Sequence, residues 1–178
     1  MTALVGDIGG TNARFALGTP DGYEEKRAYA CADFESPLTA IHTYLSDIGV
    51  GSVELIVLAV AGPIRGGEVV FTNSAWRLSE TQLGQEFGIS TVRLINDFEA
   101  VAYAATALQR DALIPVGSAE PVNLTSRSDY TVAVLGPGTG LGVSACVCRD
   151  GHAIAMRSEG GHVGFAPENE TQTLVLER

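Results

Sequence analysis

The sequence contains two glycine-rich loops of the same design. The first is Gly6-Asp-Ile-Gly-Gly-Thr-Asn-Ala-Arg14, and the second is Leu135-Gly-Pro-Gly-Thr-Gly-Leu-Gly142. Each follows a strand-like run and leads into another, and each return run reaches an Asp-Gly pair, which is a strong hairpin signal. Adjacent glycines allow unusual backbone conformations, and backbone N–H groups in such loops bind phosphate. The repeat predicts a duplicated unit that holds a phosphate from two sides.

Neither loop matches two better-known phosphate motifs. No Gly-Lys-Ser/Thr follows the first loop, and the glycines at 136, 138, 140 and 142 miss the spacing of a dinucleotide fingerprint. Either loop alone is compatible with a tight hairpin that binds nothing, but the shared Gly-Thr core favours a ligand. Asp7 is a candidate to orient a metal-bound water, and the hydroxyl and N–H of Thr11 are candidates to meet phosphate oxygens.

Asn96 and Asp97 lie where a strand-like run ends and a helical pattern begins. In open α/β sheets, ligands gather at the carboxyl ends of strands, so this position suits a site. Asn96 with Glu99 three residues later is also a helix-capping pattern, and taken alone the cap is the stronger interpretation. The functional alternative makes Asp97 a general base that takes a proton from a substrate hydroxyl.

Glu159 and His162 flank two glycines and place a carboxylate beside an imidazole. Such a pair can accept and donate hydrogen bonds to neighbouring hydroxyls of a polyol, whereas a surface turn is the alternative that needs no ligand. Two candidate ligands without a third are weak support for a metal site. In the segment 72–76, Asn73 is a candidate substrate contact, and Trp76 is interpreted as a core residue.

Composition excludes several classes of partner. The chain has 178 residues, 46% of them hydrophobic, and a formal net charge of -10. This acidity argues against nucleic acid and acidic membranes, which require basic patches. It does not exclude a nucleotide, because backbone N–H groups can hold phosphate without positive side chains. No run approaches the roughly 20 apolar residues of a membrane span, and no signal peptide is recognised, so a cytoplasmic location is expected.

The cysteines and the remaining histidines indicate no further chemistry. Cys31, Cys146 and Cys148 lack the spacing of a disulfide framework or a zinc site, and they are interpreted as buried thiols in a reducing compartment. His42 and His152 are interpreted as ordinary surface residues.

The hydrophobic pattern predicts an α/β layered domain. Extended runs at 3–8, 12–18 and 23–31 form a meander, and later strands are expected at 53–60, 68–71 and 91–95. Helices are expected from Ser36-Pro37 onward, after the capping pattern at 79–82, and over 98–108. The resulting order is β-β-β-α-β-α-β-α.

Three regions are predicted along the chain. Residues 1–110 form the N-terminal α/β domain, 111–129 a connecting segment, and 130–178 the opening of a second, similar domain. The second unit stops inside a helix expected from residue 171, so the chain is expected to be truncated at its C-terminus.

Five segments together resemble the bacterial glucokinase family of the sugar kinase–actin superfamily. The two glycine loops look like its two phosphate motifs, and the segments 72–76, 95–98 and 159–167 match its sugar-site segments in the same order. The cysteine-rich zinc motif of the repressor-type sugar kinases is absent, which favours the metal-free glucokinase branch.

The resemblance implies an RNase H-like fold and ATP-dependent phosphorylation of glucose to glucose 6-phosphate, the first step of glycolysis. Asp97 would be the catalytic base, with sugar hydroxyls held by Asn73, Asn96, Asp97, Glu159 and His162. The ATP phosphates would meet Gly6, Asp7, Ile8, Gly9, Gly10 and Thr11 of the first loop, and Gly138 and Thr139 of the second. Mg²⁺ would accompany ATP, contacted by Asp7 through water.

Two other functions stay open at this point. One is a kinase for another hexose, because these side chains do not by themselves distinguish the substituent at C2. The other is a sugar-sensing protein that keeps the fold without catalysis, although the intact Asp97 and both loops count against it. The oligomeric state is also open, with a homodimer as one alternative. Family members are longer than this chain, so we expect weak binding and poor turnover from it.

Overall fold

The computed structural model of the chain describes residues 2–20, 22–71, 76–138 and 140–177. The chain divides into two compact units, Met1–Ala100 and Val101–Arg178. The division falls inside helix α3 (Asp97–Ala107). We call them the N-terminal unit and the C-terminal unit, and each is described by itself.

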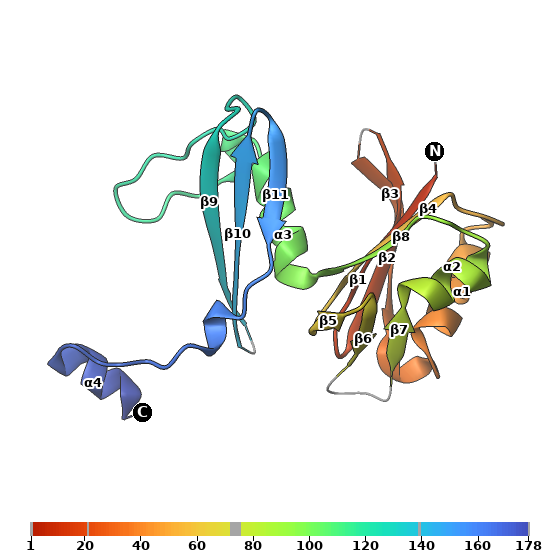
Figure 1. Cartoon of the computed structure of the whole chain (residues 1–178), viewed down its shortest axis with the longest axis horizontal. Helices are drawn as coiled ribbons and strands as arrows, with labels where there is room; N and C mark the ends of the chain where they lie inside the picture. The colour runs from red at the N-terminus through yellow and green to blue at the C-terminus, as the bar shows by residue number, and fades with distance from the viewer. Residues whose placement is uncertain (1, 21, 72–75, 139, 178) are drawn as a thin grey trace. The chain divides into compact units, whose positions relative to one another are not determined.

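A five-stranded sheet forms the centre of the N-terminal unit (Figure 1). Its strands, in spatial order, are β3 (Gly22–Ala30), β2 (Asn12–Thr19), β1 (Ala3–Ile8), β4 (Leu55–Val60) and β8 (Val92–Asn96). The first three pair antiparallel as a meander, whereas β1, β4 and β8 run parallel. This confirms the predicted meander and the later strands of the α/β domain.

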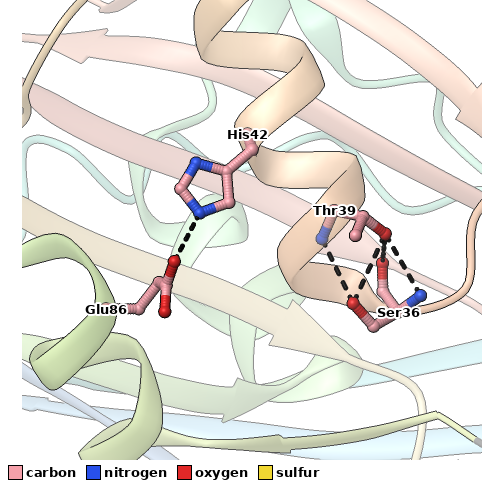
Figure 2. Close-up of polar contacts among 4 residues, drawn as sticks. All are labelled: Ser36, Thr39, His42 and Glu86. Atoms are coloured by element: carbon pink, nitrogen blue, oxygen red, sulfur yellow. Dashed lines mark hydrogen bonds and ion pairs between the residues drawn. The ribbon is translucent and has the colours of Figure 1, made fainter.

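Helices α1 (Pro37–Asp47) and α2 (Glu80–Phe87) begin at side-chain caps. Ser36 and Thr39 form a reciprocal capping box at the start of α1 (Figure 2). At the start of α2, Ser79 Oγ accepts the N–H of Gln82 at 3.0 Å. Gly88 ends α2 in the left-handed conformation that favours glycine. The caps therefore set both starting points, as the pattern at 79–82 predicts for α2.

Apolar side chains from the sheet and from α1 and α2 build one core. Leu4, Ile8, Phe15, Ile41, Ile56, Leu58 and Leu83 are fully or almost fully buried. His42 joins the two helices, because its Nε2 lies 2.8 Å from Glu86 Oε1 (Figure 2). Its ring also packs against that of Phe87. His42 is exposed, as predicted for a surface residue, and its contacts with Glu86 and Phe87 were not predicted.

The segment between β4 and α2 in the sequence forms a small antiparallel sheet, of which only the strand at 68–71 was predicted. It consists of β5 (Ile64–Arg65), β6 (Glu68–Val70) and β7 (Arg77–Ser79). Trp76 is buried next to it, with its ring 6.2 Å from that of Phe71 and its Nε1 donating to the carbonyl of Phe34 at 3.3 Å. Trp76 is thus a core residue, as predicted.

The C-terminal unit contains a three-stranded antiparallel sheet, β9 (Tyr130–Pro137), β10 (Leu141–Arg149) and β11 (His152–Met156). Asp150 and Gly151 both have positive φ and join β10 to β11 as a tight hairpin turn, as predicted. The equivalent turn in the N-terminal unit involves Asp21, which lies outside the described residues. Helix α4 (Glu170–Leu176) follows, in place of the predicted helix that runs on to Arg178.

The three cysteines are free and buried. Cys146 and Cys148 lie on the same side of β10, as the alternation of a strand predicts. Burial raises the pKa of the Cys31 and Cys146 thiols, which lowers their reactivity. Among the described residues, no helix is both long and apolar enough to cross a membrane.

Candidate active site

The first glycine loop connects β1 to β2, and its backbone conformation does not require a glycine at position 9. Gly9 N–H donates to the carbonyl of Asn12 at 2.9 Å. Its φ lies outside the left-handed region, and an added β-carbon would have its nearest neighbour, the Asn12 carbonyl oxygen, at 3.6 Å. An alanine would therefore fit here, so the accessible backbone at Gly9 suits the approach of a ligand.

The second loop connects β9 to β10 in the same way. Gly138 N–H donates to the carbonyl of Gly140 at 2.8 Å. Pro137 and Leu141, which flank the loop, are register partners of β9 and β10. Neither Gly138 nor Gly140 has a left-handed φ, and a β-carbon would find only ordinary contact at Gly138 and open space at Gly140. Thr139, the predicted phosphate contact, lies outside the described residues.

Gly6 and Ile8 belong to the first loop motif and are also part of the packed interior of the N-terminal unit. A β-carbon at Gly6 would lie 2.8 Å from both the Leu58 and Phe15 side chains, so only glycine fits there. Ile8 is completely buried. Any contact from Ile8 to a ligand would therefore come from its main chain.

Asp7 faces Arg14 across the first hairpin. The two residues are register partners of β1 and β2, and Asp7 Oδ2 accepts from the Arg14 guanidinium at 2.8 Å. Both side chains are half exposed. This ion pair was not predicted from the sequence, although equal spacing on either side of a hairpin loop is a signal for it.

Within the part of the chain that the structure describes, no three His, Cys, Asp or Glu side chains are grouped to hold a metal ion. Mg²⁺ does not require such a group, since it keeps several waters and is held through one or two carboxylates together with substrate phosphates. A half-exposed Asp7 at the end of β1 fits a contact of that kind.

The parallel strands bring the first loop and Asn96 to one edge of the sheet. Ile8 pairs with Val60, and Val60 pairs with Asn96, so these three residues form one row across β1, β4 and β8. Adjacent strands lie about 4.8 Å apart, which places the last residues of β1 and β8 about 10 Å from each other. Gly9 of the first loop and Asp97 each come one residue after this row. The first glycine loop and Asp97 therefore lie at the same end of the sheet.

Asn96 caps α3, as the capping pattern predicts. Its Oδ1 accepts the N–H of Phe98 at 2.9 Å and that of Glu99 at 3.2 Å, and Glu99 Oε2 accepts the N–H of Asn96 at 3.3 Å. Asp97 Oδ1 also accepts the Phe98 N–H at 2.9 Å. Asn96 and Asp97 are both half-buried. The capping interpretation is therefore correct, and it leaves the Asn96 NH₂ group and the second oxygen of Asp97 to be considered for a substrate.

Glu159 and His162 lie on a short turn in the C-terminal unit. Residues Gly160–His162 form a 3-10 turn (η3), and His162 Nδ1 is 3.3 Å from Glu159 Oε2. Both side chains are largely exposed. The carboxylate and the imidazole are thus adjacent and accessible, which is the arrangement predicted for contacts to neighbouring hydroxyls. Asn73, the remaining predicted sugar contact, lies outside the described residues.

A mixed five-stranded sheet with a glycine-loop hairpin, followed by a second hairpin of the same design, is typical of the sugar kinase–actin fold. The family model described as Glucokinase matches residues 4–178. A glucokinase of Caulobacter sp. (strain K31) is 45% identical over 177 residues, which cover 97% of this chain and 52% of that protein. The chain belongs to the glucokinase family.

Two solved structures are similar to the chain over nearly its whole length. A glucokinase from an Antarctic psychrotroph has a TM-score of 0.81 and 36% identity, covering 99% of this chain and 55% of its own. A glucokinase from Balamuthia mandrillaris, solved in complex with glucose, has a TM-score of 0.72 and 27% identity, covering 99% of this chain and 53% of its own. The chain spans about half the length of the curated relatives it matches.

Proposed function

We propose that this chain contributes to ATP-dependent phosphorylation of glucose at its 6-hydroxyl group, which yields glucose 6-phosphate. The observation that carries the proposal is the row Ile8–Val60–Asn96, because the first glycine loop and Asp97 both follow this row at the same end of the sheet. Membership of the glucokinase family supports the same reaction, as does the glucose bound to the Balamuthia relative.

Asp97 is the general base in this proposal. It would accept the proton of the sugar 6-hydroxyl while the oxygen attacks the γ-phosphorus of ATP in line with the leaving ADP oxygen. Its Oδ1 is held by the Phe98 N–H, so its other oxygen is the one to take the proton. General-base assistance contributes about 10²–10⁴-fold, and positioning and electrostatics supply most of the remaining acceleration.

Sugar hydroxyls would be held by Asn96, Glu159 and His162, with Asn73 as a further contact. Glu159 accepts hydrogen bonds, Asn96 presents its NH₂ group, and His162 does either according to its tautomer. A carboxylate and an imidazole 3.3 Å apart suit vicinal hydroxyls of a pyranose. None of these groups singles out the C2 substituent, so mannose and amino sugars are the competing substrates.

The nucleotide phosphates would lie against the two loops. Open backbone at Gly9, Gly138 and Gly140 supports this placement, because a bound phosphate is what a side chain would obstruct there. Asp7 would contact Mg²⁺ through water, and Thr139 would face the phosphates from the second loop. Mg²⁺ bound with ATP would neutralise charge that develops on the phosphoryl oxygens. We place the enzyme in the cytoplasm, which the three free, buried thiols support.

The test is phosphate transfer from Mg·ATP by this chain to glucose, mannose, fructose and glucosamine, with product identity read by ³¹P NMR. Turnover selective for glucose, with phosphate on the 6-oxygen, is the expected result. Faster transfer to another hexose would contradict the substrate assignment. Binding of the sugars, measured in parallel by calorimetry, separates a chain that does not bind from one that binds without turning over.

A further inference from the structure

We propose that Glu99 is a positioning residue for the sugar site. It holds Asn96 so that the side-chain carboxamide turns its NH₂ group toward the substrate, while Glu99 itself does not touch the sugar. The inference rests on the proposed function, since it concerns how the same site is held in shape.

Asn96 and Glu99 form two reciprocal hydrogen bonds, in each of which the side chain of one residue accepts the main-chain N–H of the other. Asn96 Oδ1 accepts the N–H of Glu99 at 3.2 Å and that of Phe98 at 2.9 Å. Glu99 Oε2 accepts the N–H of Asn96 at 3.3 Å. The side chain and the main chain of Asn96 are therefore both fixed by the first turn of α3.

This arrangement settles which end of the Asn96 carboxamide is available. A main-chain N–H can bond only to the oxygen of the carboxamide, and here two of them do so. The NH₂ group must then lie on the opposite branch, away from the helix. Asn96 is thus a hydrogen-bond donor to a sugar oxygen, and a sugar hydroxyl that could only donate would find no partner in it.

Burial makes Glu99 a firmer support than an ordinary cap. Glu99 is 7% exposed, whereas Asn96 and Asp97 are half-buried at the sheet edge. A buried side chain has few alternative rotamers, so the bond to the Asn96 N–H is not exchanged with water. The Phe98 N–H is shared between Asn96 Oδ1 and Asp97 Oδ1. A disturbed capping box would therefore shift the base as well as the sugar contact.

The chain offers a matched control in α1. Ser36 and Thr39 form a box with the same spacing, in which Ser36 Oγ accepts the Thr39 N–H at 3.2 Å and Thr39 Oγ1 accepts the Ser36 N–H at 3.2 Å (Figure 2). Thr39→Ala removes from α1 the same kind of bond that Glu99→Ala removes from α3. It has no part in the proposed site.

The first measurement needs neither substrate nor turnover. In the 178-residue chain, ¹⁵N relaxation gives the order parameter of the Asn96 side-chain NH₂ group. We expect Glu99→Ala to lower it from about 0.8 to below about 0.6. Glu99→Gln, which keeps an acceptor oxygen and nearly the same shape, and Thr39→Ala should leave it unchanged. An Asn96 NH₂ group that stays ordered in Glu99→Ala would overturn the proposal.

The second measurement is the affinity for glucose and kcat/KM for the same variants. Misplacement of the site should cost Glu99→Ala roughly tenfold to hundredfold in kcat/KM, with Glu99→Gln recovering most of it. Equal losses in Glu99→Ala and Thr39→Ala would mean general destabilisation and would refute a positioning role. If the unsubstituted chain binds no glucose, the proposed function fails, while the order parameter still decides the role of Glu99.

Discussion

Gly161 lies so close to the main chain of Leu141 that a β-carbon at position 161 would overlap the Leu141 carbonyl oxygen. Gly160 is restricted less severely, since a β-carbon there would lie 3.0 Å from Ser158 Oγ and 3.2 Å from the Val143 side chain. The turn that carries Glu159 and His162 is thus packed onto the first residues of β10. The two glycines tie the sugar-site candidates to the strand that leaves the second glycine loop.

Replacing Gly161 tests this packing. We expect Gly161→Ala to destabilise the turn by about 1–3 kcal/mol, because the backbone of Leu141 must move. Glucose affinity should fall with it, whereas Gly164→Ala, at a position with open space around its α-carbon, should change neither. Calorimetric titration and urea unfolding measure the two effects. An alanine tolerated at 161 as well as at 164 would show that the contact is unimportant.

Local signals in the sequence predicted much of the fold. Ser79 starts α2, and Asp150 with Gly151 forms the β10–β11 turn, because caps and tight turns depend on a few adjacent residues. The role of Asn96 was predicted only in part. Its capping role was predicted from the spacing to Glu99, but the direction of its carboxamide requires the hydrogen bonds themselves.

Very short strands and contacts between distant segments were not predicted. Strands of two or three residues, such as β5 and β7, are too short to show a periodicity. The bond between His42 and Glu86 joins helices that are far apart in the sequence, and the restriction at Gly161 depends on Leu141. Each needs the tertiary structure.

The first glycine loop should tolerate alanine structurally but not functionally. Because Gly9 has an ordinary φ and space for a β-carbon, Gly9→Ala should change the free energy of unfolding by less than about 1 kcal/mol. Affinity for an ATP analogue should fall at least about tenfold, because the methyl group would take the place of a phosphate oxygen. Gly51→Ala is the control, since Gly51 also has open space. Unchanged nucleotide affinity in Gly9→Ala would count against a phosphate at this loop.

The buried hydroxyl of Tyr44 offers a prediction on stability alone. Tyr44 is completely buried, and its hydroxyl oxygen has no hydrogen-bond partner among the residues described. Tyr44→Phe should therefore stabilise the chain by about 1 kcal/mol. Tyr29→Phe makes the comparison, because it removes a bond of 2.8 Å to Asp47 Oδ2 and should destabilise by about 1 kcal/mol. Urea midpoints that shift in the same direction for both would contradict this account.

Stability should also depend on pH above 10 through Tyr29. Burial and the hydrogen bond to Asp47 raise the pKa of Tyr29 to about 12. The unfolded chain ionises near 10, so this stabilisation is complete below about pH 10 and is lost as the pH rises to about 12. The urea midpoint should fall between about pH 10 and pH 12. Tyr29→Phe should reduce that fall, whereas Tyr23→Phe, at an exposed tyrosine, should not.

The role of Asp97 is the central claim, and Asp97→Asn tests it most directly. The amide keeps the size of the side chain and the oxygen that accepts the Phe98 N–H, but it cannot take a proton. We predict that glucose binds to Asp97→Asn within a few-fold of its original affinity, while phosphate transfer falls by about 10²–10⁴-fold. Transfer at an undiminished rate by Asp97→Asn would contradict the assignment of Asp97 as the base.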